Sequence, residues 1–394
     1  MLLGLCILVA PQLTLNIGPA GLSGQAAVAL ILTGAAASRL GLGRANTYRR
    51  VDRQWLHLLL FLSVPSTITS LLATGDPLGL LRTNLVVFIF AGAELRVLDQ
   101  TSSVAEKRWA KSLAAVFIAT SCLVGISQTL GGSLAFRAQL GKTAAITQWS
   151  GWFRANGLSR TSQDLAAVAA LALTLTWGWK GTLGSRLWKL AAAITFGVTL
   201  TRGAWIAGAA AGLVAWVRWG GRATQRMKSA LAVALLGFLL LQVDPIVARL
   251  QRSGGASDVS YSARLEERWP RILHTTTFFE PLNRAGHSVE LALQAAVGGT
   301  VDNTYLFFAV LGGWLSMISF TMIVFICVRR ALHRGPSAAS TTVFVAAYAA
   351  FVDFQSFAGL NVLCGLAIGF VLTSAESPLA TDHPAAKVSA CELR

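Results

Sequence analysis

Long apolar segments alternate with short polar breaks along almost the whole chain. A helix of roughly 20 apolar residues is long enough to cross a bilayer, so each such segment is a candidate span. Windows of this kind predict twelve spans, near residues 2–18, 22–42, 55–73, 78–98, 112–130, 164–180, 183–201, 203–219, 229–243, 304–328, 339–355 and 356–373. The pattern therefore predicts an all-α, polytopic integral membrane protein, with one transmembrane helical domain over residues 1–373 and a disordered cytoplasmic tail over 374–394.

Composition supports this class, because 54% of the 394 residues are hydrophobic and only 13% are charged. The first segment, MLLGLCILVAPQLTLNI, has neither a basic leader nor a small-x-small cleavage site, so it is predicted to stay as the first span. The five cysteines form no C-x-x-C pair and no Cys/His pattern with metal spacing. We therefore expect no disulfide framework, no metal site and no cofactor.

Positive charge sets the predicted orientation. The net charge of +16 is carried by short Lys and Arg clusters between apolar segments, which fits membrane topology and argues against a nucleic-acid partner. If the N-terminus is cytoplasmic, every short basic loop falls on the cytoplasmic side, as the positive-inside rule expects. These loops contain Arg44, Arg49, Arg50, Arg53, Lys107, Arg108, Lys111, Lys180, Arg186, Lys189, Arg222, Arg226, Lys228, Arg329, Arg330 and Arg334. Two long loops, 131–163 and 244–303, then face the periplasm, the second between the ninth and tenth spans.

Arg202 interrupts an apolar stretch that carries no other charge from Leu190 to Val217. As one helix this stretch would be about 42 Å long and would place its flanking basic loops on opposite sides of the membrane. A hairpin that turns at Thr201–Gly203 keeps the rule and places Arg202 at the external boundary. The following GAAAG, residues 208–212, predicts close packing of the second helix on a neighbour. An arginine that reaches lipid phosphates is the alternative role for Arg202.

The first long loop contains QWSGWFRANGLSR. Its apolar residues share one face of a predicted helix that would lie in the membrane interface: Ile146, Trp149, Trp152 and Phe153. Arg154 and Arg160 follow. An aromatic anchor with solvated arginines is the structural alternative for this segment.

The second long loop contains YSARLEERWPRILH. Arg264, Arg268 and Arg271 are spaced to form one stripe of a helix, and an apolar stripe lies beside it, consisting of Leu265, Trp269 and Ile272. Pro270 should kink or restart that helix. The alternative is a solvated face on which Glu266 and Glu267 pair with the arginines.

Up to four arginine clusters are thus predicted to converge at the external boundary. The planar guanidinium group matches phosphate oxygens well, so the predicted ligand is an anionic lipid head group.

Four sequence pieces, in this order, resemble the O-antigen ligase and O-antigen polymerase superfamily of bacterial envelope proteins. They are RANGLSRTSQDLA at 154–166, TRGAW at 201–205, ARLEERW at 263–269 with EPLNRAG at 280–286, and DNTYLFFAVLGGW at 302–314. The twelve spans and the large loop after the ninth span are also similar to that family.

The resemblance implies a glycosyltransferase at the periplasmic face of the bacterial cytoplasmic (inner) membrane. Such an enzyme transfers a glycan from a polyprenyl diphosphate carrier, such as undecaprenyl diphosphate, to a hydroxyl of a glycan or lipid acceptor, without a metal. Arginines placed where charge develops on the leaving diphosphate can replace a divalent metal. By position, Arg202 and Arg264 would bind the diphosphate, and Arg154, Arg160 and Arg268 are further candidates.

The acceptor hydroxyl needs a general base. Asp302 stands where many ligases have histidine, and His287 is the alternative base; Asp302 could instead cap the helix that starts at Thr304. Asn303 and Tyr305 would orient the sugar or the base, although Tyr305 also suits the aromatic belt of a membrane protein. The aspartate, and the Asn283–Arg284 pair in EPLNRAG, favour a polymerase or a generic ligase-like transferase over a typical ligase.

Two other classes stay open. A transporter or exporter, of a small anion such as bicarbonate or of a glycolipid, would need acidic or broken-helix sites near the midplane. Glu94 and Asp353 are the loose candidates, and both are predicted near span ends. A lipid-binding scaffold would explain the basic loops but does not need the ordered motif set.

Overall fold

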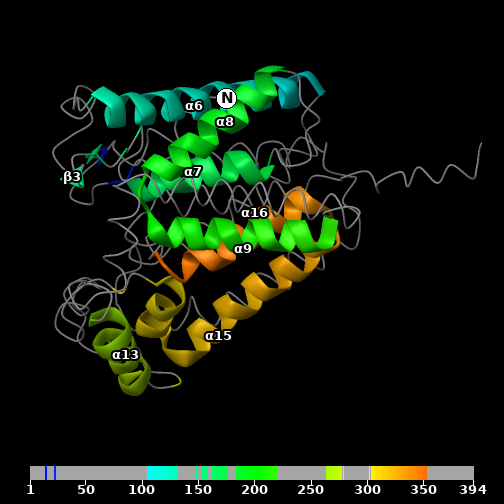
Figure 1. Cartoon of the computed structure of the whole chain (residues 1–394). Helices are drawn as coiled ribbons and strands as arrows, with labels where there is room; N and C mark the ends of the chain where they lie inside the picture. The colour runs from blue at the N-terminus through cyan, green and yellow to red at the C-terminus, as the bar shows by residue number, and fades with distance from the viewer. Residues whose placement is uncertain are drawn as a thin grey trace, which may run out of the picture.

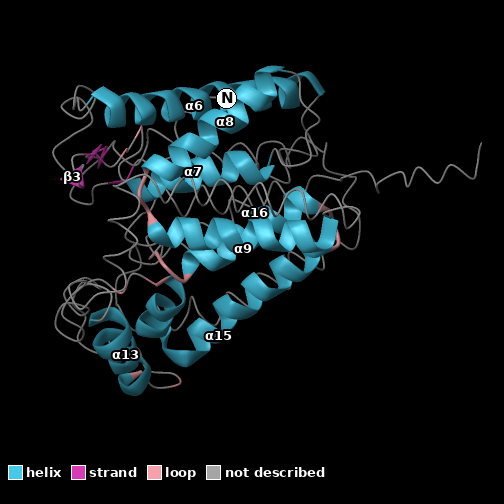
Figure 2. Cartoon of the chain, in the orientation of Figure 1, coloured by secondary structure: helices cyan, strands magenta, loops and turns pink. Residues whose placement is uncertain are grey.

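The computed structural model describes residues 14–15, 22–23, 104–131, 148–149, 152–153, 155, 157, 162–175, 183–219, 263–276, 278, 301 and 303–352. This part of the chain is all-helical apart from four two-residue strands (Figure 2). The all-α prediction is therefore confirmed for the described residues. The predicted spans at 55–73, 78–98, 229–243 and 356–373 and the tail at 374–394 lie outside them.

The helices of the described part follow the predicted apolar segments. They are α6 (Val104–Gly131), α7 (Ser162–Leu175), α8 (Leu183–Val198), α9 (Arg202–Trp219), the π-helix η2 (Ala263–Arg268), α13 (Trp269–Thr275), α15 (Thr304–Leu332) and α16 (Pro336–Ala349). Among the described residues, one stretch, Gly313–Leu332, is long and apolar enough to cross a membrane by length and composition. Shorter apolar helices cover Ser162–Thr174 and Leu187–Val198.

Helices α6 to α9, α15 and α16 form a bundle in which chain direction alternates (Figure 1). We call one end of the bundle the motif end. It is formed by the end of α6, the start of α7, the α8–α9 turn, the start of α15 and the end of α16. We call the opposite end the basic end. It is formed by the other helix termini and carries basic residues that include Lys189, Arg218, Arg329 and Arg330. Basic residues at that end are what the predicted cytoplasmic loops would require.

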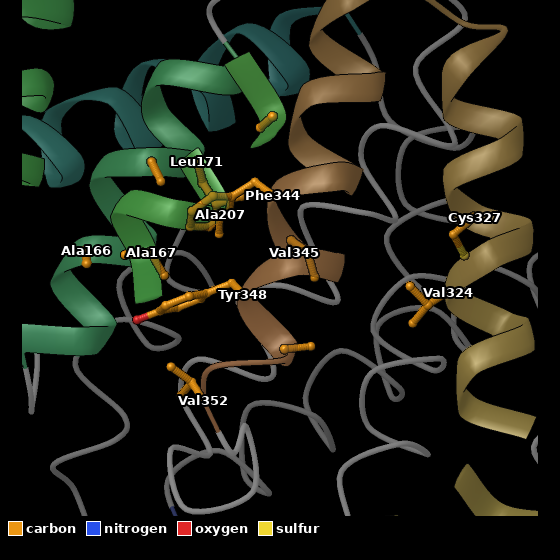
Figure 3. Close-up of a cluster of buried hydrophobic side chains, with 14 of the residues drawn as sticks. Ala166, Ala167, Leu171, Ala207, Val324, Cys327, Phe344, Val345, Tyr348 and Val352 are labelled. Atoms are coloured by element: carbon orange, nitrogen blue, oxygen red, sulfur yellow. The ribbon is translucent and has the colours of Figure 1, made fainter. Parts of the chain in front are cut away.

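Small residues let α9 and α16 approach closely, and this is the most extensive helix pair of the described part. Ala204, Ala207 and Ala211 form a buried stripe on α9 at helical spacing. Phe344 and Tyr348, stacked at 5.3 Å between ring centroids, point from α16 toward α7 and α9 (Figure 3). The packing depends on matching large aromatic rings to alanines, as in other close helix pairs.

The predicted GAAAG packing is therefore only partly right. Alanines carry the contact with α16. A Cβ at Gly208 would lie 2.9 Å from the ring of Phe196 on α8, whereas one at Gly212 would meet nothing within 4 Å.

Helix α15 is irregular at Gly313, which has φ 72°. The N–H of Leu315 donates to the carbonyl of Phe278, 3.2 Å away, instead of continuing the helix ladder. Glycine adopts this left-handed conformation at little cost, so LGGW permits the bend. The helix α15, Thr304–Leu332, covers the whole predicted span at 304–328, and its first turns pack against α13.

Three predicted helical segments contain extended residues instead. Thr14–Leu15 pair with Leu22–Ser23 as antiparallel strands β1 and β2, inside the predicted first and second spans. Gln148–Trp149 pair with Trp152–Phe153 as strands β3 and β4, so Trp149 faces Trp152 across a hairpin and not along a helix. The physical reason for strands β3 and β4 is local, because Trp149 and Trp152 flank Ser-Gly, and a two-residue loop of this kind favours a hairpin.

Candidate functional site

The break in the apolar stretch around Arg202 is confirmed, with a turn over Thr199–Thr201 instead of the predicted Thr201–Gly203. Its middle residue, Leu200, has φ 50° and is fully buried. The N–H of Leu200 donates to the carbonyl of Gly197 at 3.2 Å and closes α8. A non-glycine residue in this conformation costs about 1–2 kcal/mol. The packing around the turn must offset that cost, which indicates a turn held firmly in place.

Arg202 is the first residue of α9 and is partly buried. The N–H groups at a helix start point away from the helix and carry positive partial charge. The indole nitrogen of Trp205 donates to the carbonyl of Phe196 at 3.1 Å, which fixes the first turn of α9 to the last turn of α8. A guanidinium group next to a positive helix end is unfavourable by itself and favourable beside an anion. The position of Arg202 therefore suits binding of an anionic group.

Gly203 lies where α9 meets the end of α16. A Cβ built at Gly203 would lie 2.5 Å from the Cβ of Phe351, nearer than two such carbons can approach. The Cβ of Phe351 is fixed by its backbone, so it cannot rotate away. The second residue of α9 therefore allows this close contact only as glycine.

Gly203→Ala is expected to destabilise the protein by about 1–3 kcal/mol, because the two helices must separate to accept the methyl group. Gly212→Ala is the matched control on the same helix, since its methyl group would enter open space. Thermal unfolding of the purified variants should show a lower midpoint for Gly203→Ala and an unchanged or higher midpoint for Gly212→Ala. Equal midpoints would contradict the close contact.

The first turn of α7 lies against the α8–α9 turn and the end of α16. The hydroxyl of Thr201 donates to the carbonyl of Ser162 at 3.4 Å, and the hydroxyl of Tyr348 donates to the carbonyl of Gln163 at 3.1 Å. The end of the RANGLSRTSQDLA piece is thereby joined to TRGAW.

Asp164 lies in the same turn of α7 and is only 7% exposed. Carboxylates are rarely buried this deeply in proteins. Reasoning from the arginines misses this residue; the signal for it is an acid placed directly before an apolar run. Asp164 adds an acidic side chain to the motif end.

The start of α15 is tied to the end of α16 by a hydrogen bond from the hydroxyl of Thr304 to the carbonyl of Val352, at 2.6 Å. Tyr305 donates its hydroxyl to the carbonyl of Ala346 at 2.9 Å, and its ring meets Phe320 edge-on. Tyr305 thus packs from the first turns of α15 against α16 and Phe320. The DNTYL piece thus joins the same end of the bundle.

Asn303 is the N-cap of α15, with its side-chain oxygen accepting from the N–H of Leu306 at 3.2 Å. The alternative prediction that Asp302 caps this helix is therefore wrong. The cap explains why Asn303 is buried, and no role toward a sugar is needed to explain it.

The second long loop forms the predicted helix, with the restart at Pro270 confirmed: η2 ends at Arg268, and Pro270 lies in the first turn of α13. Ile272 is fully buried and the indole nitrogen of Trp269 donates to the carbonyl of Val301 at 3.0 Å, so these two residues of the apolar stripe face the bundle. The indole nitrogen of Trp314 donates to the carbonyl of Thr276 at 2.8 Å. The helix α13 is thereby joined to the residue Val301 before α15 and to Trp314 within α15.

The predicted arginine stripe is less regular than an α-helix would make it. Arg268 is partly buried and Arg271 is exposed, as are Glu266 and Glu267. Arg264 lies in η2, where the wider π-helical turn changes the alignment of residues four apart. The side chain of Arg264 is outside what the structure describes.

The remaining predicted site residues, Arg154, Arg160, His287 and Asp302, lie outside the described residues. Arg202, Asn303 and Tyr305 belong to the motif end, whereas Arg268 is the last residue of η2, directly before α13. The path is continuous: the start of α9 contacts the end of α16, which bonds the start of α15, whose preceding segment bonds α13. No group of three or more His, Cys, Asp or Glu side chains that could hold a metal ion occurs in the described part of the chain.

No protein-family model matches the chain, and no curated protein matches it by sequence.

Proposed function

We propose that the chain is a membrane glycosyltransferase of the O-antigen ligase or polymerase type, which transfers a glycan from a polyprenyl diphosphate carrier to an acceptor hydroxyl at the periplasmic face. One observation carries the proposal. The described residues of all four sequence pieces meet at one end of the bundle, through hydrogen bonds and close contacts between segments far apart in the chain. Arg202 stands at a helix start within that end.

The membrane part of the proposal is supported by apolar side chains on the outside of the helices. Each of α6, α8, α9 and α15 exposes large apolar residues at spacings of three, four or seven, so that they lie along one face of the helix. They are Val116, Leu123, Leu130, Leu187, Leu190, Ile194, Ile206, Leu213, Val217, Ile318, Met322 and Phe325. Water-soluble proteins rarely expose apolar surface on this scale, whereas lipid chains would cover it favourably.

The proposed reaction is a substitution at the anomeric carbon of the carrier-linked sugar. The acceptor oxygen forms a bond to that carbon while the bond from the carbon to the diphosphate oxygen breaks. The hydroxyl proton passes to a general base, and the electron pair of the broken bond leaves with the diphosphate. Guanidinium groups held in place before the reaction stabilise the charge that develops on the leaving group. Arg202 fits this role because the helix start adds its own partial charge.

A transporter is less well supported by the same residues. Carriers often bind ions at helix breaks that leave backbone groups open. The irregularity of α15 at Gly313 frees the N–H of Leu315, but the carbonyl of Phe278 takes that hydrogen bond. This backbone N–H is therefore bonded within the chain and is not open to an ion.

The proposed orientation predicts which positions an impermeant thiol reagent can reach. Thr275, the last residue of α13, and His333, in the turn between α15 and α16, are both exposed; α13 packs against the first turns of α15, and His333 follows its last turn. In a background without the five native cysteines, Thr275→Cys should be labelled in intact spheroplasts, and His333→Cys only after permeabilisation. Labelling of His333→Cys from outside would reverse the orientation and remove the site from the periplasmic face.

The activity itself is tested by incubating the purified protein with an undecaprenyl-diphosphate-linked glycan and an acceptor glycan. The proposal predicts an extended or transferred glycan, together with free undecaprenyl diphosphate in equal amount. A carrier that stays loaded while the protein is folded would contradict it.

A further inference from the structure

A side chain of α6 clamps an irregular segment of the motif end. Gln128 lies near the end of α6 and is 6% exposed. The N–H of Gly157 donates to Oε1 of Gln128 at 2.9 Å, and Nε2 of Gln128 donates to the carbonyl of Gly157 at 3.2 Å. One side chain thus satisfies both backbone groups of a buried residue 29 positions away. A primary amide can do this because it carries a donor and an acceptor side by side.

Gly157 is fitted closely into this position. Its φ is +58°, and a Cβ would lie 2.5 Å from the carbonyl oxygen of Ser121 and 2.8 Å from a methyl group of Leu165. The segment is therefore held between α6 and α7. Gly157 belongs to no helix or strand, and its two buried backbone groups are bonded by the Gln128 side chain.

The segment that Gln128 clamps contacts the end of α8, which precedes Arg202. Ala155, two residues before Gly157, is fully buried, and its N–H donates to the carbonyl of Val198 over a long 3.5 Å. Val198 is the last residue of α8, four positions before Arg202. Contacts thus run from Gln128 through the 155–157 segment to the α8–α9 turn.

We propose that Gln128 is a positioning residue: by clamping Gly157 it supports the end of α8, and thereby sets the position from which Arg202 binds a diphosphate. This inference rests on the proposed function. If the amide is replaced by an apolar group, two buried backbone groups lose their partners and the segment must shift to find others. The turn that carries Arg202 then loses one of its supports, although Gln128 does not touch the ligand.

The test measures binding of undecaprenyl diphosphate, without a glycan, to the purified full-length protein in detergent micelles. Gln128→Met keeps the length of the side chain and removes both hydrogen bonds, so its Kd should rise about tenfold. Arg202→Ala should bind more weakly still. The double variant should be no weaker than Arg202→Ala, because Gln128 acts through Arg202.

Thr195→Val is the matched control. Thr195 is fully buried on α8, and its hydroxyl lies 2.8 Å from the carbonyl of Ala191 and 3.3 Å from that of Cys122 on α6, so it links α8 to α6 by a bond that does not involve Gly157. Its removal should lower the thermal midpoint and leave Kd unchanged. A structural role for Gln128 would give it the same behaviour as Thr195→Val.

A second variant keeps the inference testable if Gln128→Met does not fold. Gln128→Glu keeps the acceptor for the N–H of Gly157 and loses the donor, so it should fold and show an intermediate Kd. Wild-type affinity in the folded Gln128 variants, with Arg202→Ala weakened, would overturn the inference alone. Absence of binding by the wild type, or wild-type binding by Arg202→Ala, would overturn the proposed function together with it.

Discussion

Arg202→Lys is expected to reduce glycan transfer about 10²-fold while the protein still folds and inserts. Lysine keeps the positive charge but loses the planar fork that bonds two phosphate oxygens at once. The partly buried start of α9 leaves little freedom for a longer-range contact to replace it. The measurement is turnover of an undecaprenyl-diphosphate-linked glycan by purified variants at matched concentration.

Arg218→Lys is the matched control for this experiment. Arg218 lies on the same helix at the basic end and is exposed, so the substitution should leave turnover unchanged. Near-normal transfer by both Arg202→Lys and Arg202→Ala would assign Arg202 to anchoring on lipid phosphates and would remove it from the site.

Asp302→Asn is expected to lower transfer by roughly 10²-fold or more if Asp302 is the general base, with binding of the lipid donor retained. The structure sharpens this experiment, because Asn303 caps α15 through Leu306. A loss of activity in Asp302→Asn therefore cannot be explained by a lost helix cap. His287→Ala should then have a mild effect.

The opposite pattern would exchange the two roles. Normal turnover by Asp302→Asn and an inactive His287→Ala would make His287 the base. If both variants stay active while Arg202 is essential, the site binds a lipid diphosphate without transferring its glycan, and the transporter becomes the better account.

The helices of the described part could be predicted because their apolar runs are long and their ends carry clear polar breaks. A helix break near Arg202 was predicted from charge alone, since a continuous helix would have broken the positive-inside rule. The restart of the helix at Pro270 followed from the missing N–H of proline. At Arg202 and at Pro270, a single property of one residue decides where the helix is interrupted.

The prediction failed where competing local signals had to be weighed. QWSGWF has both helical spacing of its aromatic residues and a hairpin loop, and the hairpin is what forms. The bend of α15 at Gly313 depends on a carbonyl of Phe278, which is distant in sequence. Hydropathy cannot detect a hydrogen bond of that kind.

For the candidate site, the sequence predicted charged residues that could bind a ligand. It did not predict the buried polar residues that support the surrounding backbone. Arg202 and the TRGAW piece were predicted, whereas the buried Asp164 and the clamp from Gln128 to Gly157 were not. Glutamine in an apolar helix has many ordinary roles, and only its partner in the fold reveals this one.

Transfer by the purified wild-type protein in the presence of EDTA tests the central claim most directly. The account predicts undiminished formation of product and an equal amount of free undecaprenyl diphosphate, because arginines take the place of a metal at the leaving group. Arg202→Lys in the same reaction should form little product. A wild-type protein that is folded, binds the carrier and transfers nothing, or one that EDTA inactivates, would contradict it.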